Sequence, residues 1–66
     1  MNLVKRTNDQ YVIQVTWDEL RILLNAINET LEAVEDWELP IRVGAEVHEL
    51  KALQSSIRGL REQAND

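Results

Sequence analysis

The clearest pattern in the chain is a helical repeat of apolar residues between Thr16 and Glu35. Thr16-Trp17-Asp18-Glu19 matches a capping box, in which the threonine hydroxyl and the Glu19 carboxylate each accept a hydrogen bond from the other residue's backbone N–H. Steps of three and four residues, with one adjacent pair, place the following side chains on one face of an amphipathic helix: Leu20, Leu23, Leu24, Ile27, Leu31 and Val34. We therefore predict a first helix over residues 16–35.

A second helical repeat occupies the C-terminal third of the chain. Its apolar positions are spaced almost as a heptad seam: Val47, Leu50, Leu53, Ile57, Leu60 and Ala64. This spacing predicts a second helix over residues 45–64, and two amphipathic helices joined by a short segment are expected to pack antiparallel.

The first fifteen residues have strand character instead. Tyr11-Val12-Ile13-Gln14-Val15 is aromatic and β-branched, with alternate side chains on one face. Leu3-Val4 is a shorter candidate strand, and Thr7-Asn8-Asp9 has turn chemistry between the two. Residues 1–15 are therefore predicted to form a strand or a hairpin packed alongside the helices.

Residues 36–44 break the helical period. Apolar side chains alternate with polar ones or proline from Trp37 to Val43, and Pro40 biases Leu39 toward an extended backbone. Either a short edge strand or a packed extended connector fits this pattern, and the connector is favoured. The chain is predicted to be one domain (1–66) of the α+β class, mostly helical, with an N-terminal strand or β-hairpin followed by an antiparallel two-helix hairpin.

The short length makes self-association an expected source of stability. A chain of 66 residues without cysteine has a small core and no disulfide, and one histidine, His48, is too few for a typical zinc site. We therefore expect a homo-oligomer with no metal, cofactor or catalytic residues.

The charge of the chain favours basic protein partners. Twelve Asp and Glu against seven Lys and Arg give a net charge of -5, which repels nucleic acid. No apolar run is long enough for a signal peptide or a membrane span, so a cytoplasmic location without membrane contact is expected.

Acidic side chains gather around the end of the first predicted helix and the connector. The residues expected to bind a partner are Glu29, Glu32, Glu35, Asp36, Trp37 and Glu38. Carboxylates near a helix C-terminus repel one another and the helix dipole, which indicates a role other than stability. The alternative is a solvated face that keeps the protein soluble, and metal binding or acid–base catalysis is the weakest reading because no Gly-rich loop or partner base accompanies the cluster.

A minor apolar strip lies on the opposite side of the first predicted helix from its apolar face. It consists of Ile22, Ala26 and Ala33, and its small side chains would let another helix approach closely. We predict self-association through this strip; scattered surface apolar residues are the alternative.

Two resemblances bear on function. Asp18-Glu19-Leu20, Asn25-Ala26-Ile27-Asn28-Glu29, Trp37-Glu38-Leu39 and Arg42-Val43-Gly44 together resemble a group of small, mostly uncharacterised bacterial proteins, some of which look like immunity or interaction proteins. That resemblance implies a non-catalytic binding protein. One strand followed by two helices also resembles the ribbon-helix-helix repressors, but the strand presents Val12 and Gln14 without Lys or Arg, so a DNA-binding regulator ranks third.

Overall fold

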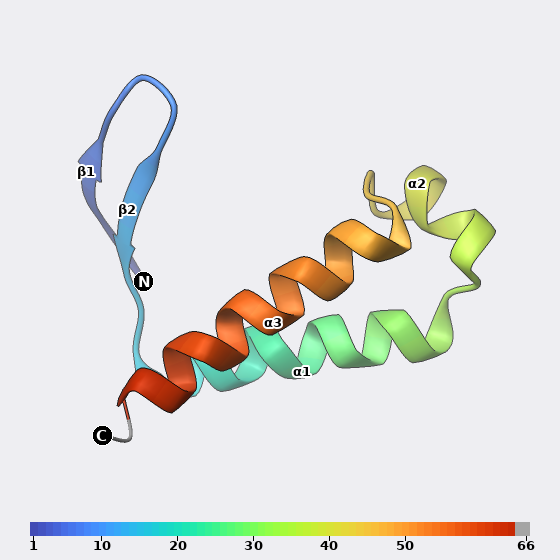
Figure 1. The fold of residues 1–66 in the computed structure, drawn as a ribbon. Helices are drawn as coiled ribbons and strands as arrows, with labels where there is room; N and C mark the ends of the chain where they lie inside the picture. The colour runs from blue at the N-terminus through green and yellow to red at the C-terminus, as the bar shows by residue number, and fades with distance from the viewer. Residues whose placement is uncertain (65–66) are drawn as a thin grey trace.

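The protein consists of a β-hairpin followed by a helical hairpin, which confirms the predicted α+β, mostly helical class. A computed structural model describes residues 1–64 (Figure 1). The elements in chain order are β1 (Asn2–Arg6), β2 (Tyr11–Gln14), α1 (Trp17–Ala33), the 3-10 turn η1 (Asp36–Glu38), α2 (Leu39–Arg42) and α3 (Val47–Ala64).

The N-terminal strands form a true hairpin, so the short apolar stretch at Leu3-Val4 does supply a first arm. β1 and β2 pair antiparallel, with Leu3 opposite Ile13 and Arg6 opposite Tyr11. A bulge between Leu3 and Lys5 interrupts the register of β1. At the other end the loop is closed by a bond from the Thr7 N–H to the Gln10 carbonyl (2.9 Å).

The junction between the hairpin and α1 is fixed by the predicted capping box. The Glu19 N–H donates to the Thr16 hydroxyl (3.1 Å), and the Thr16 N–H donates to Glu19 Oε1 (2.9 Å). The Met1 ammonium also bonds to the Glu19 carboxylate, at 2.8 Å from Oε2. The Glu19 carboxylate therefore binds two groups at once: the backbone N–H of the residue that caps α1 and the ammonium of the residue that precedes β1.

α1 and α3 lie antiparallel and side by side, as the two apolar repeats predicted (Figure 1). The Gln54 side-chain amide donates to the Asn28 side-chain oxygen and so links the two helices through a half-buried polar contact. The buried hydrophobic core among the described residues is small: Leu24, Leu39, Leu50 and Ile57. Most of the other apolar residues facing the helix contact are half-buried, and Leu23, Leu53 and Leu60 are exposed.

The prediction of an extended connector over residues 36–44 is wrong, because most of this segment is helical. η1 and α2 occupy residues 36–42, and Leu39 has helical backbone angles (φ −55°, ψ −47°) despite preceding Pro40. Proline is tolerated at the first positions of a helix, where its missing N–H would have no helical partner. α2 ends at Arg42, and Gly44, two residues later, has a positive φ of 79° that allows its N–H to bond back to the Leu39 and Pro40 carbonyls.

The helices are also shorter than predicted at the connector. α1 ends at Ala33 and not at residue 35, because Val34 and Glu35 adopt extended backbones. α3 begins at Val47 and not at residue 45; the Glu46 N–H bonds to the Glu49 carboxylate (3.0 Å) immediately before its first turn.

The prediction that the hairpin packs alongside the helices is wrong. Every residue from 1 to 14 is exposed, and the hairpin stands away from the helical unit (Figure 1). The Cα radius of gyration is consequently 13.4 Å, compared with about 10.8 Å for a compact chain of this length. Only Val15 and Thr16 join β2 to α1.

Leu39 is expected to be the most sensitive position in the helical unit. Its side chain is fully buried (0% exposed), whereas its neighbour Ile41 is 79% exposed. Leu39→Ala should lower the free energy of unfolding by about 2–5 kcal/mol, enough to unfold much of so small a domain. Ile41→Ala, the matched control, should change it by less than about 0.5 kcal/mol in urea denaturation.

Glu19 should give the protein an acid-labile junction. The hydrogen bond from the Met1 ammonium, followed by that from the Thr16 N–H, holds the pKa of Glu19 below its ordinary value of 4.5. A lowered folded-state pKa contributes stability that is present above pH 4.5 and is lost as the pH falls through the lowered value. Stability measured between pH 6 and 2 should therefore fall less steeply in Glu19→Gln than in the wild type; an unchanged slope would contradict this role of Glu19.

Candidate protein-binding surface

The predicted acidic residues are exposed at the end of the helical unit farthest from the hairpin. We call the surface formed by the last turns of α1 and by η1 the acidic surface; its members are Glu29, Glu32, Glu35, Asp36, Trp37 and Glu38. All of these residues are exposed except Glu38, which is half-buried. The structure therefore brings the sequence-predicted set to one end of the molecule.

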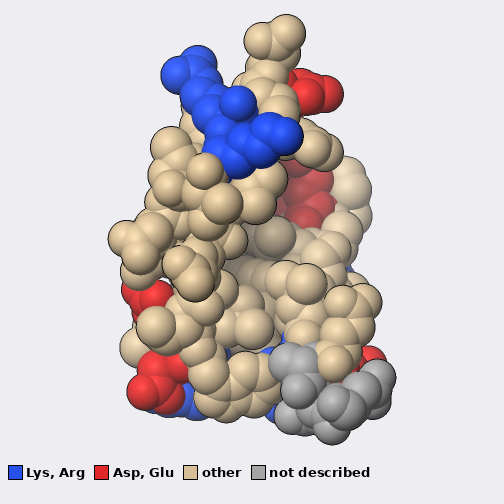
Figure 2. All heavy atoms as spheres, turned by 90° about the vertical axis from the view of Figure 1, so that its left-hand side faces the viewer, with Lys and Arg blue, Asp and Glu red and all other residues tan. Residues whose placement is uncertain are grey.

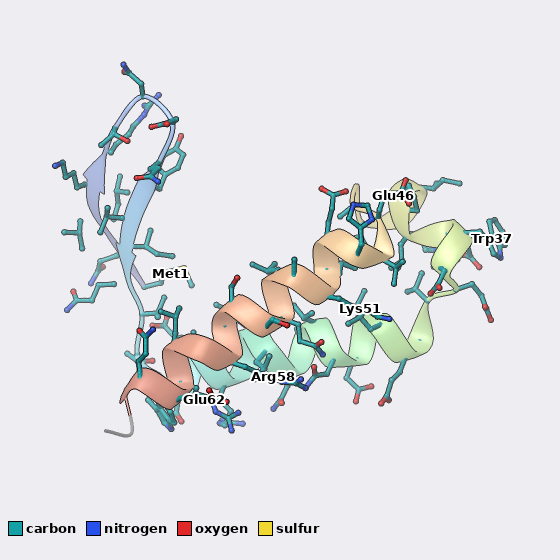
Figure 3. All side chains as sticks on the ribbon, in the orientation of Figure 1. Met1, Trp37, Glu46, Lys51, Arg58 and Glu62 are labelled. Atoms are coloured by element: carbon teal, nitrogen blue, oxygen red, sulfur yellow. The ribbon has the colours of Figure 1, made fainter. Side chains whose placement is uncertain are left out.

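Trp37 is the large apolar side chain of the acidic surface. It is 72% exposed and extends outward from η1, away from both helices (Figure 3). Leu39, and not Trp37, is the buried residue of this segment. Trp37 is therefore available to a partner.

Glu38 differs from the other acidic residues because it has an ion-pair partner. Arg42, one turn later, places its Nε 2.6 Å from Glu38 Oε2. Arg42 is 66% exposed, so the contact is a surface ion pair. Within residues 1–64 the other four carboxylates of the acidic surface have no ion-pair partner.

The acidic surface is poorly placed for the stability of α1. The last turn of α1 contains no basic residue, so Glu32 and its neighbours lie near the negative end of the helix dipole without compensation. Glu29 and Glu32 are one turn apart and repel each other. The arrangement therefore does not stabilise the helix, and its use has to be sought in what approaches from outside.

The predicted self-association strip is also on the surface. Ile22, Ala26 and Ala33 are all exposed, and Ile22 is 57% exposed although it lies in the middle of an ordered helix. Leu24, two residues later, faces α3 and is 2% exposed. The strip is thus an outer face of α1, as the helical period indicated.

An exposed apolar surface on the hairpin was missed by sequence reasoning. Tyr11, Ile13 and Leu3 share one face of the hairpin, where they are 66%, 50% and 60% exposed. Arg6 lies on the same face, with its guanidinium 5.7 Å from the centre of the Tyr11 ring. The alternation in Tyr11–Gln14 indicated the face but not its exposure, because the same pattern is typical of a strand that packs on a core.

Other kinds of site have little support in the geometry. The described part of the chain contains no pocket and no group of three His, Asp or Glu side chains placed to share a metal ion. Over the same residues, none of the helices combines the length and the apolar character needed to cross a lipid bilayer.

Comparison of the chain with protein-family models, with curated proteins and with solved structures finds no significant match. The resemblance to small bacterial immunity or interaction proteins accordingly stays a prediction. For the ribbon-helix-helix plan, the structure adds that β2 is paired with β1 of its own chain.

Proposed function

We propose that the protein is a non-catalytic binding module that docks a basic protein partner through the acidic surface, in the manner of an immunity or inhibitor protein in the cytoplasm. The observation that carries the proposal is the combination of four carboxylates without ion-pair partners and a 72% exposed tryptophan at one end of the molecule. The two kinds of side chain supply different parts of a binding energy.

Trp37 would supply the anchor. Tryptophan is among the residues that most often dominate binding energy when a partner covers them, because the ring buries a large area at a small cost in side-chain entropy. Exposed to water, the same ring contributes nothing to folding. Its outward position is therefore more easily explained by binding than by packing (Figure 3).

The carboxylates would supply orientation and speed of association. Glu29, Glu32 and Glu35 extend the charge along the end of α1, and Asp36 lies next to Trp37. A surface of one sign attracts a basic partner over about 10 Å at moderate salt and accelerates encounter. Rim charges of this kind change the association rate more than the dissociation rate.

Reversal of the surface charge is expected to abolish partner capture. The triple variant Glu29→Lys, Glu32→Lys, Glu35→Lys should fold, because all three side chains are exposed, and should lose the proteins that the wild type retains in a pull-down from its native host. If every interaction of the wild type survives in the triple variant, the acidic surface is not the binding site.

A matched pair separates local docking from the effect of net charge. Glu32→Lys and Glu62→Lys each change the charge of the chain by +2, and both residues are exposed on helices. Glu62 lies in α3, outside the acidic surface. Association should slow markedly in Glu32→Lys and little in Glu62→Lys; equal slowing would mean that only the total charge matters.

A second candidate is a structural homo-oligomer, and the exposure of Ile22 favours it. An isoleucine that is 57% exposed in the middle of an ordered helix, beside an exposed alanine one turn later, is a contact that a second helix could cover. The strip is narrow, since two of its three members are alanines. It would therefore be one part of a larger interface and would not form an interface by itself.

Sedimentation of Ile22→Glu tests this candidate. A carboxylate in place of the largest side chain of the strip should reduce the molar mass of any oligomer that uses it, because burying an unpaired charge is costly. Ile41→Glu places the same charge on an apolar residue outside the strip and should leave the mass unchanged. An unaltered mass for Ile22→Glu would exclude the strip as an interface.

A further inference from the structure

The hairpin is the part of the molecule that is least explained by the fold or by the proposed function. It has two strands of five and four residues, and all of its residues are exposed. A two-stranded hairpin is marginally stable in water and normally needs a third strand or a packed helix. Among the described residues, neither is supplied by the same chain.

The chain exposes more surface than a compact chain of its mass, and the excess is as large as a protein–protein interface. Its accessible surface is 5437 Å², whereas a compact chain of 7.7 kDa exposes about 4,300 Å². The difference of about 1,100 Å² exceeds the roughly 800 Å² that each partner contributes to a standard specific interface. A protein that covered its hairpin with a second molecule would recover this area.

The two free edges of the hairpin are not equivalent. The β1 edge is interrupted by the bulge between Leu3 and Lys5, and it has two adjacent cations, Lys5 and Arg6, which form the basic patch at the outer end of the hairpin (Figure 2). Bulges and basic side chains are the devices by which proteins block pairing at a sheet edge. β1 is thus a protected edge.

The β2 edge has none of these devices. Tyr11-Val12-Ile13-Gln14 contains no charge, no proline and no bulge. Within residues 1–64, no hydrogen bond reaches the backbone of these four residues from outside the hairpin ladder. An uninterrupted apolar strand with a free edge is a template for another strand.

We propose that β2 pairs antiparallel with β2 of a second copy of this chain, across a twofold axis, to form a continuous four-stranded sheet in the order β1-β2-β2-β1. A twofold contact uses the same edge on both copies and closes, whereas pairing of β2 with β1 of another copy would propagate into a filament. The protected β1 edges then become the outer edges of the sheet. This self-association uses a surface separate from the acidic surface and does not depend on the proposed function.

Charge favours the antiparallel arrangement. In each copy the outer end of the hairpin has Lys5 and Arg6, and the other end leads through Val15 and Thr16 into α1, where Asp18 is 80% exposed. Both carboxylates at the helix start have cationic partners, Asp18 with Arg21 at 3.7 Å and Glu19 with the Met1 ammonium at 2.8 Å, so the charges that decide the orientation are Lys5 and Arg6. Antiparallel pairing of two four-residue strands, each about 13 Å long, keeps the basic ends of the two hairpins apart, whereas parallel pairing would place them side by side. The two helical units, with most of the negative charge, leave the sheet at opposite ends.

Sedimentation equilibrium on the full chain tests the proposal. The wild type should shift with concentration from 7.7 kDa toward twice that mass and no further. Val12→Lys should weaken the dimer at least about tenfold, because it places like charges close together across the new strand pair. Val4→Lys is the matched control: it exchanges another exposed valine (62% exposed, against 46% for Val12) for the same cation on the bulged strand, and it should leave the dimer intact.

Hydrogen exchange of the wild type provides a readout that does not rely on a variant's folding. In a monomer only alternate N–H groups of β2 bond to β1, so within Tyr11–Gln14 the others exchange freely. In the proposed dimer all four are protected, and the added protection disappears on dilution. A monomer at every concentration, equal weakening by Val4→Lys and Val12→Lys, a mass that rises beyond the dimer, or dissociation by Ile22→Glu but not by Val12→Lys would each overturn the proposal.

Discussion

The contact between α1 and α3 is the interaction on which the rest of the structure depends. It buries Leu24 on one helix and Leu50 and Ile57 on the other, and the turn at Leu39 closes its end. Full burial of such side chains stabilises a fold by about 1.5–3 kcal/mol each, which is small beside the entropy cost of ordering the chain. The helical unit therefore has little stability to spare, and it cannot also cover the hairpin.

The parts of the fold that follow from local chemistry were predictable from sequence. The spacing from Leu20 to Val34 identified α1, and the capping box at Thr16 and Glu19 is present as expected. The hairpin also followed from Thr7-Asn8-Asp9 between two apolar stretches. In each case the signal is a hydrogen bond or a period contained within a few residues.

Features that depend on tertiary context were not predictable in this way. Alternating apolar residues around Pro40 indicated an extended segment, but burial of Leu39 between the helices outweighs the preference of a residue before proline, and the segment coils into η1 and α2. Likewise, Tyr11 and Ile13 have the pattern of a core-facing strand, yet both are exposed, because alternation along a strand does not specify what covers its apolar face. Exposure of Glu29, Glu32 and Glu35 was predictable because charges at a helix end need no tertiary information, and their role in binding stays a prediction.

The distribution of charge connects the two proposed surfaces. Residues 1–15 have two cations and one anion, a net charge of +1, and the remaining residues have five cations and eleven anions, a net charge of -6, so the negative charge of the chain belongs to the helical unit. α1 is about 26 Å long, and it separates the hairpin from the acidic surface at its far end (Figure 1). Occupation of one surface therefore does not obstruct the other. A dimer joined at the hairpins would display two acidic surfaces at its two distant ends, and a partner with two basic sites at a matching distance would be held far more tightly than by either surface alone, because its second contact forms within the same complex.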